Sequence, residues 1–183
     1  MKLYELQPKL RAECVYVTVK ASADRMFDYF VLPDGDGKFL QYMKLVGEAD
    51  TGVKDSDLEK VDFLEGFVSL PIFSQKFVEL LSAEIGDEIT FYPIEIKAKT
   101  TSKGFFVAKI NRYLDIIDYE KSDAEMIDGE PFLATMDNVV YNENLPEFFI
   151  ARDRFSQTDW YISDKLKALI DKHKLQIKVV EPW

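Results

Sequence analysis

The sequence predicts an α+β fold, in which a mostly antiparallel sheet is covered by a few helices within a single domain, residues 1–183. The chain has 183 residues, 47% of them hydrophobic, which is enough for one substantial core. Within residues 70–122, the apolar positions change from a helical period to a strand period of two. A second unit of this kind follows near the C-terminus.

The first sixty residues combine predicted strands, one helix and polar connections. Residues 3–20 contain an alternating strand pattern, and a short helix is expected at residues 24–30 with Ser22 as its candidate cap. A further strand is predicted at residues 39–46. Residues 47–60 are acidic and rich in Gly, Asp and Thr, which indicates a solvent-facing connection. On the first strand, one face is expected to carry Val15, Val17 and Val19, and the other Tyr16 and Thr18.

Asp34 and Asp36 occupy alternate positions of a sharp turn at residues 33–37, as ligands do in a calcium loop. The EF-hand pattern then requires another oxygen ligand and a glycine. This chain has Lys38 and Phe39 at those positions. A plain turn is therefore the better interpretation.

Residues 70–122 form the best-organised predicted unit. Ser74 directly precedes an apolar pattern at helical spacing, so it is expected to cap a helix that ends at a turn at residues 86–87. Residues 89–96 predict a strand that is paired on both sides and partly buried on both faces. An apolar strand is then expected over residues 105–118.

The chain beyond residue 122 is first acidic and then returns to a strand and helix pattern. Residues 123–131 are interpreted as an acidic turn and residues 132–141 as a strand. Ser163 stands before apolar residues at the same offsets as those that follow Ser74, so it is expected to cap a second helix. Residues 175–179 predict the last strand.

The formal net charge is −10, from 33 acidic and 23 basic side chains. This balance argues against nucleic acid as a partner, because binding a phosphate backbone needs clustered Lys and Arg. Excess negative charge is typical of a soluble protein, and it also suits a basic protein partner. The chain has no apolar run of the length of a membrane span and no signal-peptide pattern, so a cytoplasmic location without membrane contact is expected.

Few residues offer catalytic or metal-binding chemistry, and no catalytic residue, cofactor or metal is predicted. Cys14, the single cysteine, excludes an internal disulfide and is interpreted as a small buried hydrophobe. His173, the single histidine, lies among lysines at a helix end, where it suits the helix dipole. Asp115 and Asp118 bracket two isoleucines, but in a strand they would face opposite sides and could not act as a pair.

Arg152 and Arg154 alternate in a strand-like segment and are expected to share a face. Pairing with Asp153 or other nearby acids is one interpretation. An anion site is the other.

Several short segments resemble one family of bacterial immunity proteins. They are PIFS at 71–74, FYPIEI at 91–96, FVAKIN at 106–111, LDIID at 114–118 and KS at 121–122. The likeness is to the eleventh family of polymorphic-toxin immunity proteins, first catalogued as a domain of unknown function, and it is clearest over residues 63–180. The family's short Phe-Arg strand corresponds to residues 149–152. A glycine that the family often carries before its last strand is replaced by Leu175 and Gln176.

The resemblance implies a noncatalytic protein that binds and neutralises a cognate toxin by occlusion in the producing cell. It assigns no binding residues, so the partner-binding residues and the oligomeric state stay unknown. The acidic connections at residues 47–60 and 123–131 are candidates for the polar rim of an interface. Two alternatives remain open. One is a carboxylate-dependent hydrolase or transferase, which a cleft of converging acids would favour, and the other is a self-associating regulatory subunit, which a large apolar patch would favour.

Overall fold

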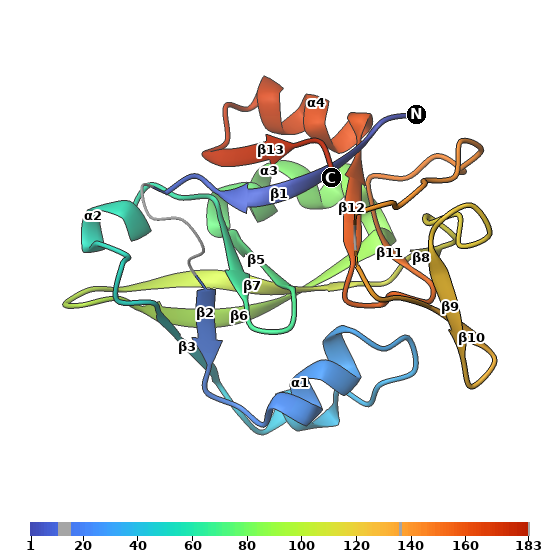
Figure 1. Ribbon diagram of the computed structural model, residues 1–183. Coiled ribbons are helices and arrows are strands. Elements are labelled where there is room, and N and C mark those ends of the chain that lie inside the picture. The colour runs from blue at the N-terminus through green and yellow to red at the C-terminus, as the bar shows by residue number, and fades with distance from the viewer. Residues whose placement is uncertain (11–15, 136, 183) are drawn as a thin grey trace.

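The computed structural model describes residues 1–10, 16–135 and 137–182, and it places most strands in two layers (Figure 1). One layer is a closed six-stranded barrel, and the other is an open five-stranded sheet. Helices and strands are both present, and described strands pair mostly in antiparallel fashion, as predicted. The prediction of a sheet with covering helices is incomplete, because it does not include the closed barrel. Closure of the barrel depends on pairing between segments that are distant in the sequence, which no local sequence pattern indicates.

The barrel has the strand order β2-β3-β6-β7-β5-β4. Its longest component is the β6–β7 hairpin, which pairs from Ile89 and Ile110 to Lys97 and Ser102. β6 also pairs with β3 over residues 94–97, so the predicted pairing on both sides is present in that part. The bounds are β2 (Tyr16–Val19), β3 (Leu45–Ala49), β4 (Phe63–Gly66), β5 (Leu70–Ser74), β6 (Ile89–Lys97) and β7 (Ser102–Ile110).

The open sheet brings the two ends of the chain together, because β1 lies between β13 and β12. A separate two-stranded hairpin, β9–β10, stands at the edge of the molecule (Figure 1). The sheet strands are β1 (Leu3–Pro8), β8 (Tyr113–Leu114), β11 (Ile150–Asp153), β12 (Trp160–Ser163) and β13 (Ile177–Val180), and the hairpin strands are β9 (Ala124–Ile127) and β10 (Glu130–Leu133).

The three longer helices lie at opposite ends of the molecule, with α3 and α4 beside the open sheet and α1 at the far end of the barrel, whereas the short α2 lies at one side (Figure 1). A core of apolar side chains fills the space between α3, α4, the open sheet and one side of the barrel, where the rings of Phe73 and Phe77 stack 3.9 Å apart. A second core fills the barrel and packs against α1. The bounds are α1 (Ala23–Phe30), α2 (Asp55–Leu58), α3 (Gln75–Ile85) and α4 (Asp164–Lys172), with 3-10 turns at Lys38–Gln41 and Gly86–Glu88.

Serine caps begin both long helices, as predicted. The Ser74 Oγ accepts a hydrogen bond from the Phe77 N–H at 3.2 Å, and the Ser163 Oγ accepts one from the Lys165 N–H at 3.2 Å. Ser22 precedes α1 as predicted, but its side chain makes no capping hydrogen bond.

The strand predicted at residues 39–46 is wrong over most of its length. Residues 38–41 form a 3-10 turn, and β3 instead continues to Ala49, into the predicted connection. Gly47 accounts for the continuation of β3, because a Cβ there would lie 2.6 Å from Val17 Cγ1 and 2.8 Å from Ile96 Cδ1. The glycine permits close packing inside the barrel and is not a strand breaker here.

Two predictions after β7 are also wrong. The strand expected over residues 105–118 ends at Ile110, because its partner β6 begins opposite it at Ile89, and only the two residues of β8 follow as a strand. Further along, the Asp153 carboxylate accepts the N–H groups of Ile116 and Ile117. The acidic turn predicted at 123–131 holds β9, a turn at residues 128–129 and the start of β10. The strand predicted at 132–141 is present only at residues 132–133 among the described residues, apart from an isolated bridge between Tyr141 and Ile117. Asp-Gly is a type I′ turn signal, and it identifies this hairpin.

Candidate functional site

The aspartates of the rejected calcium loop have a local structural role. The Asp36 carboxylate accepts the Lys38 N–H at 2.9 Å and forms an ion pair with the Lys38 Nζ at 3.0 Å. These hydrogen bonds lower the pKa of Asp36. Among the residues that the structure describes, no group of three or more His, Cys, Asp or Glu side chains is arranged to hold a metal ion.

Asp115 and Asp118 do not act together, although the predicted reason was wrong. Neither lies in a strand. The Asp115 carboxylate is 2.7 Å from the Arg154 Nε, and the Asp118 carboxylate is 2.6 Å from the Lys121 Nζ. Each carboxylate is therefore neutralised by its own cation.

Arg152 and Arg154 do not share a face, because β11 ends between them and Arg154 is largely exposed. Arg152 is fully buried and donates through Nη1 to the Gln157 carbonyl at 2.8 Å and through Nη2 to the Ser69 carbonyl at 3.4 Å. Burial lowers the pKa of Arg152 to about 10. Carbonyl groups thus accept from both terminal nitrogens, whereas the buried Nε has no hydrogen-bond partner among the described residues.

Asp153 is not the partner of Arg152. Its buried carboxylate accepts hydrogen bonds from the Tyr119 hydroxyl at 2.6 Å and from the Phe155 and Ser156 N–H groups at 2.9 Å. These bonds, with those to residues 116 and 117, fix the loops beside β11. The role of Asp153 is structural.

His173 lies at the C-terminal end of α4, as predicted. Its backbone N–H donates to the Leu169 carbonyl at 3.0 Å. Cys14 lies outside the described residues.

A small cleft between β1, β4 and the start of β12 brings three carboxylates near each other: Glu5, Glu65 and Asp159. Its volume is about 190 Å³. Burial and the charge of Glu5 raise the pKa of Glu65 to about 7. Burial followed by the charge of Asp159 raises the pKa of Glu5, and burial raises the pKa of Asp159.

This carboxylate cleft has one property of an acid–base site, because a carboxyl group with a pKa near 7 can donate a proton at neutral pH. Its volume is below the roughly 300–1,000 Å³ of ordinary ligand pockets. The three acids come from separate segments of the chain, so sequence reasoning missed them and no local motif could have found them.

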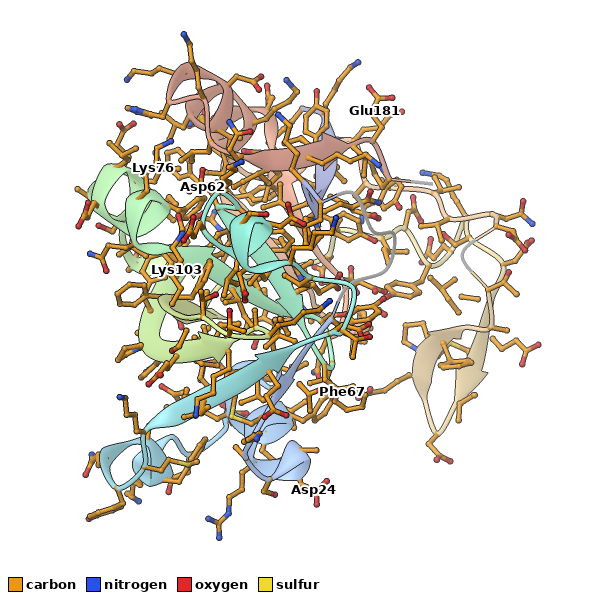
Figure 2. All side chains as sticks on the ribbon, turned by 90° about the vertical axis from the view of Figure 1, so that its left-hand side faces the viewer. Asp24, Asp62, Phe67, Lys76, Lys103 and Glu181 are labelled. Atoms are coloured by element: carbon orange, nitrogen blue, oxygen red, sulfur yellow. The ribbon has the colours of Figure 1, made fainter. Side chains whose placement is uncertain are left out.

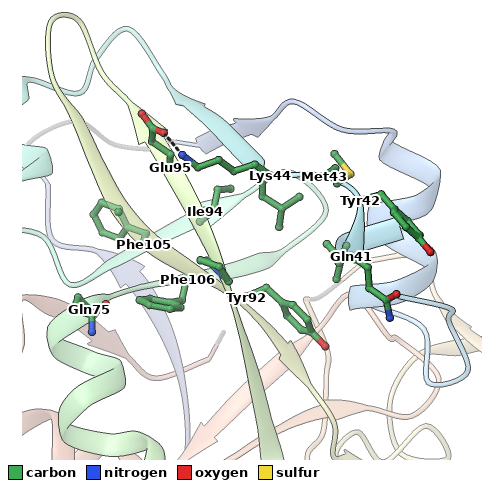
Figure 3. Close-up of a pocket in the computed structure, with 14 residues that line it drawn as sticks. Gln41, Tyr42, Met43, Lys44, Gln75, Tyr92, Ile94, Glu95, Phe105 and Phe106 are labelled. Carbon is green, nitrogen blue, oxygen red and sulfur yellow. Dashed lines mark hydrogen bonds and ion pairs between the residues drawn. The ribbon is translucent and has the colours of Figure 1, made fainter. Parts of the chain in front are cut away.

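A larger groove of about 660 Å³ lies between residues 40–45 and the β6–β7 hairpin (Figure 3). Its lining includes the apolar side chains of Ile94, Phe105 and Phe106. The Lys44 Nζ forms an ion pair with the Glu95 carboxylate at 3.2 Å, which Figure 3 marks beside the groove. No sequence pattern had singled out this groove.

Comparison with known protein families matches residues 2–178 to the immunity protein family (Imm11). The chain belongs to the Imm11 family. The match includes the first sixty residues, which lie outside the range where the sequence likeness is clearest, so β1 and the first barrel strands belong to the Imm11 region as well. No curated protein matches the chain. In the described part of this Imm11 protein, no helix has the length and apolarity needed to cross a membrane.

The two acidic connections of this Imm11 chain differ in structure. In residues 47–60, the Asp55 carboxylate accepts the N–H groups of Thr100 and Thr101 at 3.1 and 3.2 Å, which ties α2 to the tip of the β6–β7 hairpin. Hydrogen bonds from Thr100 and Thr101, of which the one from the Thr100 hydroxyl has the largest effect, lower the pKa of Asp55 to about 2. Residues 123–131 lie in the β9–β10 hairpin, whose strands pair only with each other within the described structure.

Proposed function

We propose that this protein binds and neutralises a cognate bacterial toxin in the cytoplasm of the cell that produces the toxin. The observation that carries the proposal is the Imm11 match over residues 2–178. The proposed mode is occlusion: the protein covers the working surface of the toxin and does not alter the toxin chemically.

The charge and the surface support this mode. A net charge of −10 favours rapid encounter with a basic partner, because opposite charges steer association. A stable complex of this kind buries roughly 1,600 Å² or more, with apolar anchors inside a polar rim. Exposed apolar side chains that could serve as anchors include Tyr42, Phe67, Met126, Ile127 and Phe132.

Co-expression tests the proposal. The partner is the toxic C-terminal domain encoded next to this gene, produced from an inducible promoter in a sensitive host. We expect growth to be restored when this protein is present, and a complex of the two chains to survive affinity purification. Continued growth arrest in the presence of this protein, together with no copurification, would contradict the proposal.

A carboxylate-dependent hydrolase or transferase is the second candidate, and the raised pKa values in the carboxylate cleft favour it. The variants Glu65→Gln and Asp159→Asn separate the two functions. Occlusion predicts that both variants still protect the host. A hydrolase that uses these carboxylates predicts that protection is lost while the chain remains folded.

A further inference from the structure

We infer that the β9–β10 hairpin is a toxin-contacting element and that its solvent-facing side fits a basic toxin surface around an apolar hollow. The inference rests on the proposed function and names the surface through which that function acts.

The turn of the hairpin sets which side chains share a face. Both residues of the Asp128–Gly129 turn have positive φ, at 51° and 89°, as a type I′ turn requires. In the resulting register, Ile127 pairs with Glu130 and Phe132 pairs with Glu125. Directly opposed residues, and alternate residues along a strand, point to the same side. The outer face therefore consists of Glu125, Ile127, Glu130 and Phe132.

The outer face is open to solvent, whereas the other side is partly covered. Ile127 is 50% exposed and Phe132 is 51% exposed, and the two glutamates of the outer face are exposed as well. On the inner face, Ala124, Pro131 and Leu133 are half-buried, and Met126 is 68% exposed. Ile127 and Phe132 are diagonal neighbours across the two strands, so they form one small apolar centre with a glutamate beside each.

Hydrogen bonds fix the base of the hairpin. The buried Ser122 donates through Oγ to the Asp118 carbonyl at 2.7 Å and accepts the Val140 N–H at 3.0 Å. The Asn138 amide donates to the Asp123 carboxylate at 2.6 Å. Beyond this base the hairpin stands apart from the barrel, as the two perpendicular views show (Figures 1 and 2). A partner can therefore approach the outer face without displacing another element.

The charge of the chain is concentrated here. Residues 119–143 contain seven acidic side chains and one basic side chain, so they supply six of the ten net negative charges. The basic residue, Lys121, already forms an ion pair with Asp118. Among the described residues, no ion pair involves Glu125, Asp128 or Glu130. We therefore expect the partner to supply the positive charges that pair with these carboxylates.

Acidic and apolar side chains together on the outer face favour a protein partner with a basic surface. Acidic side chains alone would serve solubility, but the outer face also presents Ile127 and Phe132, each with about half of its surface exposed to solvent. An apolar centre inside a charged rim is the usual composition of a protein interface. Lysine and arginine side chains around an apolar hollow complement both parts.

The test measures binding of a catalytically disarmed form of the toxin domain encoded beside this gene. Glu125→Lys combined with Glu130→Lys reverses the charge of the outer face, and we expect the association rate constant to fall by about tenfold or more at low salt. Ile127→Ser combined with Phe132→Ser removes the apolar centre, and we expect the Kd to rise by about thirtyfold or more.

The matched control carries Glu79→Lys and Glu84→Lys on the exposed side of α3, which changes the net charge by the same amount. We expect its association rate constant to stay within about threefold of the unmodified protein, because the local field at the hairpin is unchanged. Amide hydrogen exchange of the unmodified protein supplies a readout that needs no substitution, and toxin is expected to slow exchange in residues 124–133.

The outcomes separate this inference from the proposed function. If the unmodified protein binds the toxin, but the hairpin variants bind as the control does and residues 124–133 gain no protection, the inference fails and the proposed function stands. If the unmodified protein neither binds the toxin nor protects the host, both fail. Protection of these amides in a dimer of the free protein, with no further change on adding toxin, would assign the hairpin to self-association and overturn the inference.

Discussion

Ser74 and Asp62 form a buried hydrogen bond of 2.7 Å, from the Ser74 Oγ to the Asp62 Oδ1, that joins the cap of α3 to the residue before β4. The other oxygen of the Asp62 carboxylate accepts the Gln176 N–H at 2.7 Å, just before β13. The Lys76 Nζ lies 3.8 Å from the same carboxylate, and Figure 2 shows the two residues together. A single buried side chain thus connects the barrel, α3 and the open sheet.

We expect Asp62→Ala to lower the free energy of unfolding by about 2–4 kcal/mol, because it leaves a buried hydroxyl and a backbone N–H without their acceptor. Ser74→Ala should cost about 1–2 kcal/mol, since it removes the helix cap. The double variant should lose about 1 kcal/mol less than the sum, because the two residues share one bond. Urea unfolding measures all three. Additive losses would show that the bond does not couple the two residues.

Glu88 makes the corresponding connection on the other side of the core. Its carboxylate accepts the N–H groups of Phe149 and Ile150 at 2.7 and 3.0 Å and lies 2.6 Å from the Arg112 Nη1. We expect Glu88→Ala to lower the free energy of unfolding by about 3 kcal/mol, because these buried donors lose their acceptor. Exchange of Glu143 for Ala on the surface is the control, and a similar loss there would argue against this role of Glu88.

A residue with positive φ follows each of the two long helices, but only one of these residues is glycine. Gly86 has φ 66° after α3, and Lys174 has φ 51° after α4. We expect Lys174→Gly to stabilise the fold by up to about 1 kcal/mol, because glycine adopts positive φ without strain. Gly86→Ala should destabilise it by about 1–3 kcal/mol, because Gly86 combines φ 66° with ψ −133°. Thermal unfolding of both variants measures the effects, which should have opposite signs.

The carboxylate cleft makes stability depend on pH. The pKa of Glu65 rises from its ordinary value of 4.5 to about 7 on folding. The folded chain therefore binds a proton at Glu65 more tightly than the unfolded chain does. The contribution of this proton to the free energy of unfolding is complete below the unfolded pKa and is lost as the pH rises through 7. We expect the free energy of unfolding to fall by roughly 2 kcal/mol between pH 5 and pH 8.

Glu65→Gln isolates this effect. The variant should be more stable than the unmodified protein at pH 8, and its stability should change less across the interval, with a residual slope from Glu5 and Asp159. Urea unfolding at several pH values provides the measurement. Equal pH dependence in both proteins would show that Glu65 titrates at its ordinary pKa in the folded chain.

Local chemistry explains which elements could be predicted from the sequence. The helices that follow Ser74 and Ser163 could be predicted, because the capping serine and the apolar residues at helical spacing lie within a few residues of each other. Gly47 misled the prediction, because a glycine that breaks a strand and one that permits close packing look alike in sequence. The Asp128–Gly129 turn carried a usable hairpin signal within a stretch whose acidic composition suggested a loop.

The candidate sites were less accessible to prediction. The cleft unites Glu5, Glu65 and Asp159 only because β1, β4 and β12 meet in space. The partners of Arg152, which are carbonyl groups of residues 69, 157 and 158, likewise lie in segments that only the fold brings together. The acidic stretch at 123–131 was proposed as an interface rim from composition alone, and its paired strands now define which side chains face outward.

Titration of toxin activity with this protein tests the central claim most directly. Increasing amounts are added to a fixed amount of active toxin, and the remaining activity is measured; the toxin is then separated under denaturing conditions and refolded. Neutralisation by occlusion predicts a linear loss of activity that ends at a fixed molar ratio of the two chains, and full recovery of activity after separation. Inactivation by far less than an equimolar amount, with toxin that stays inactive after separation, would contradict the account.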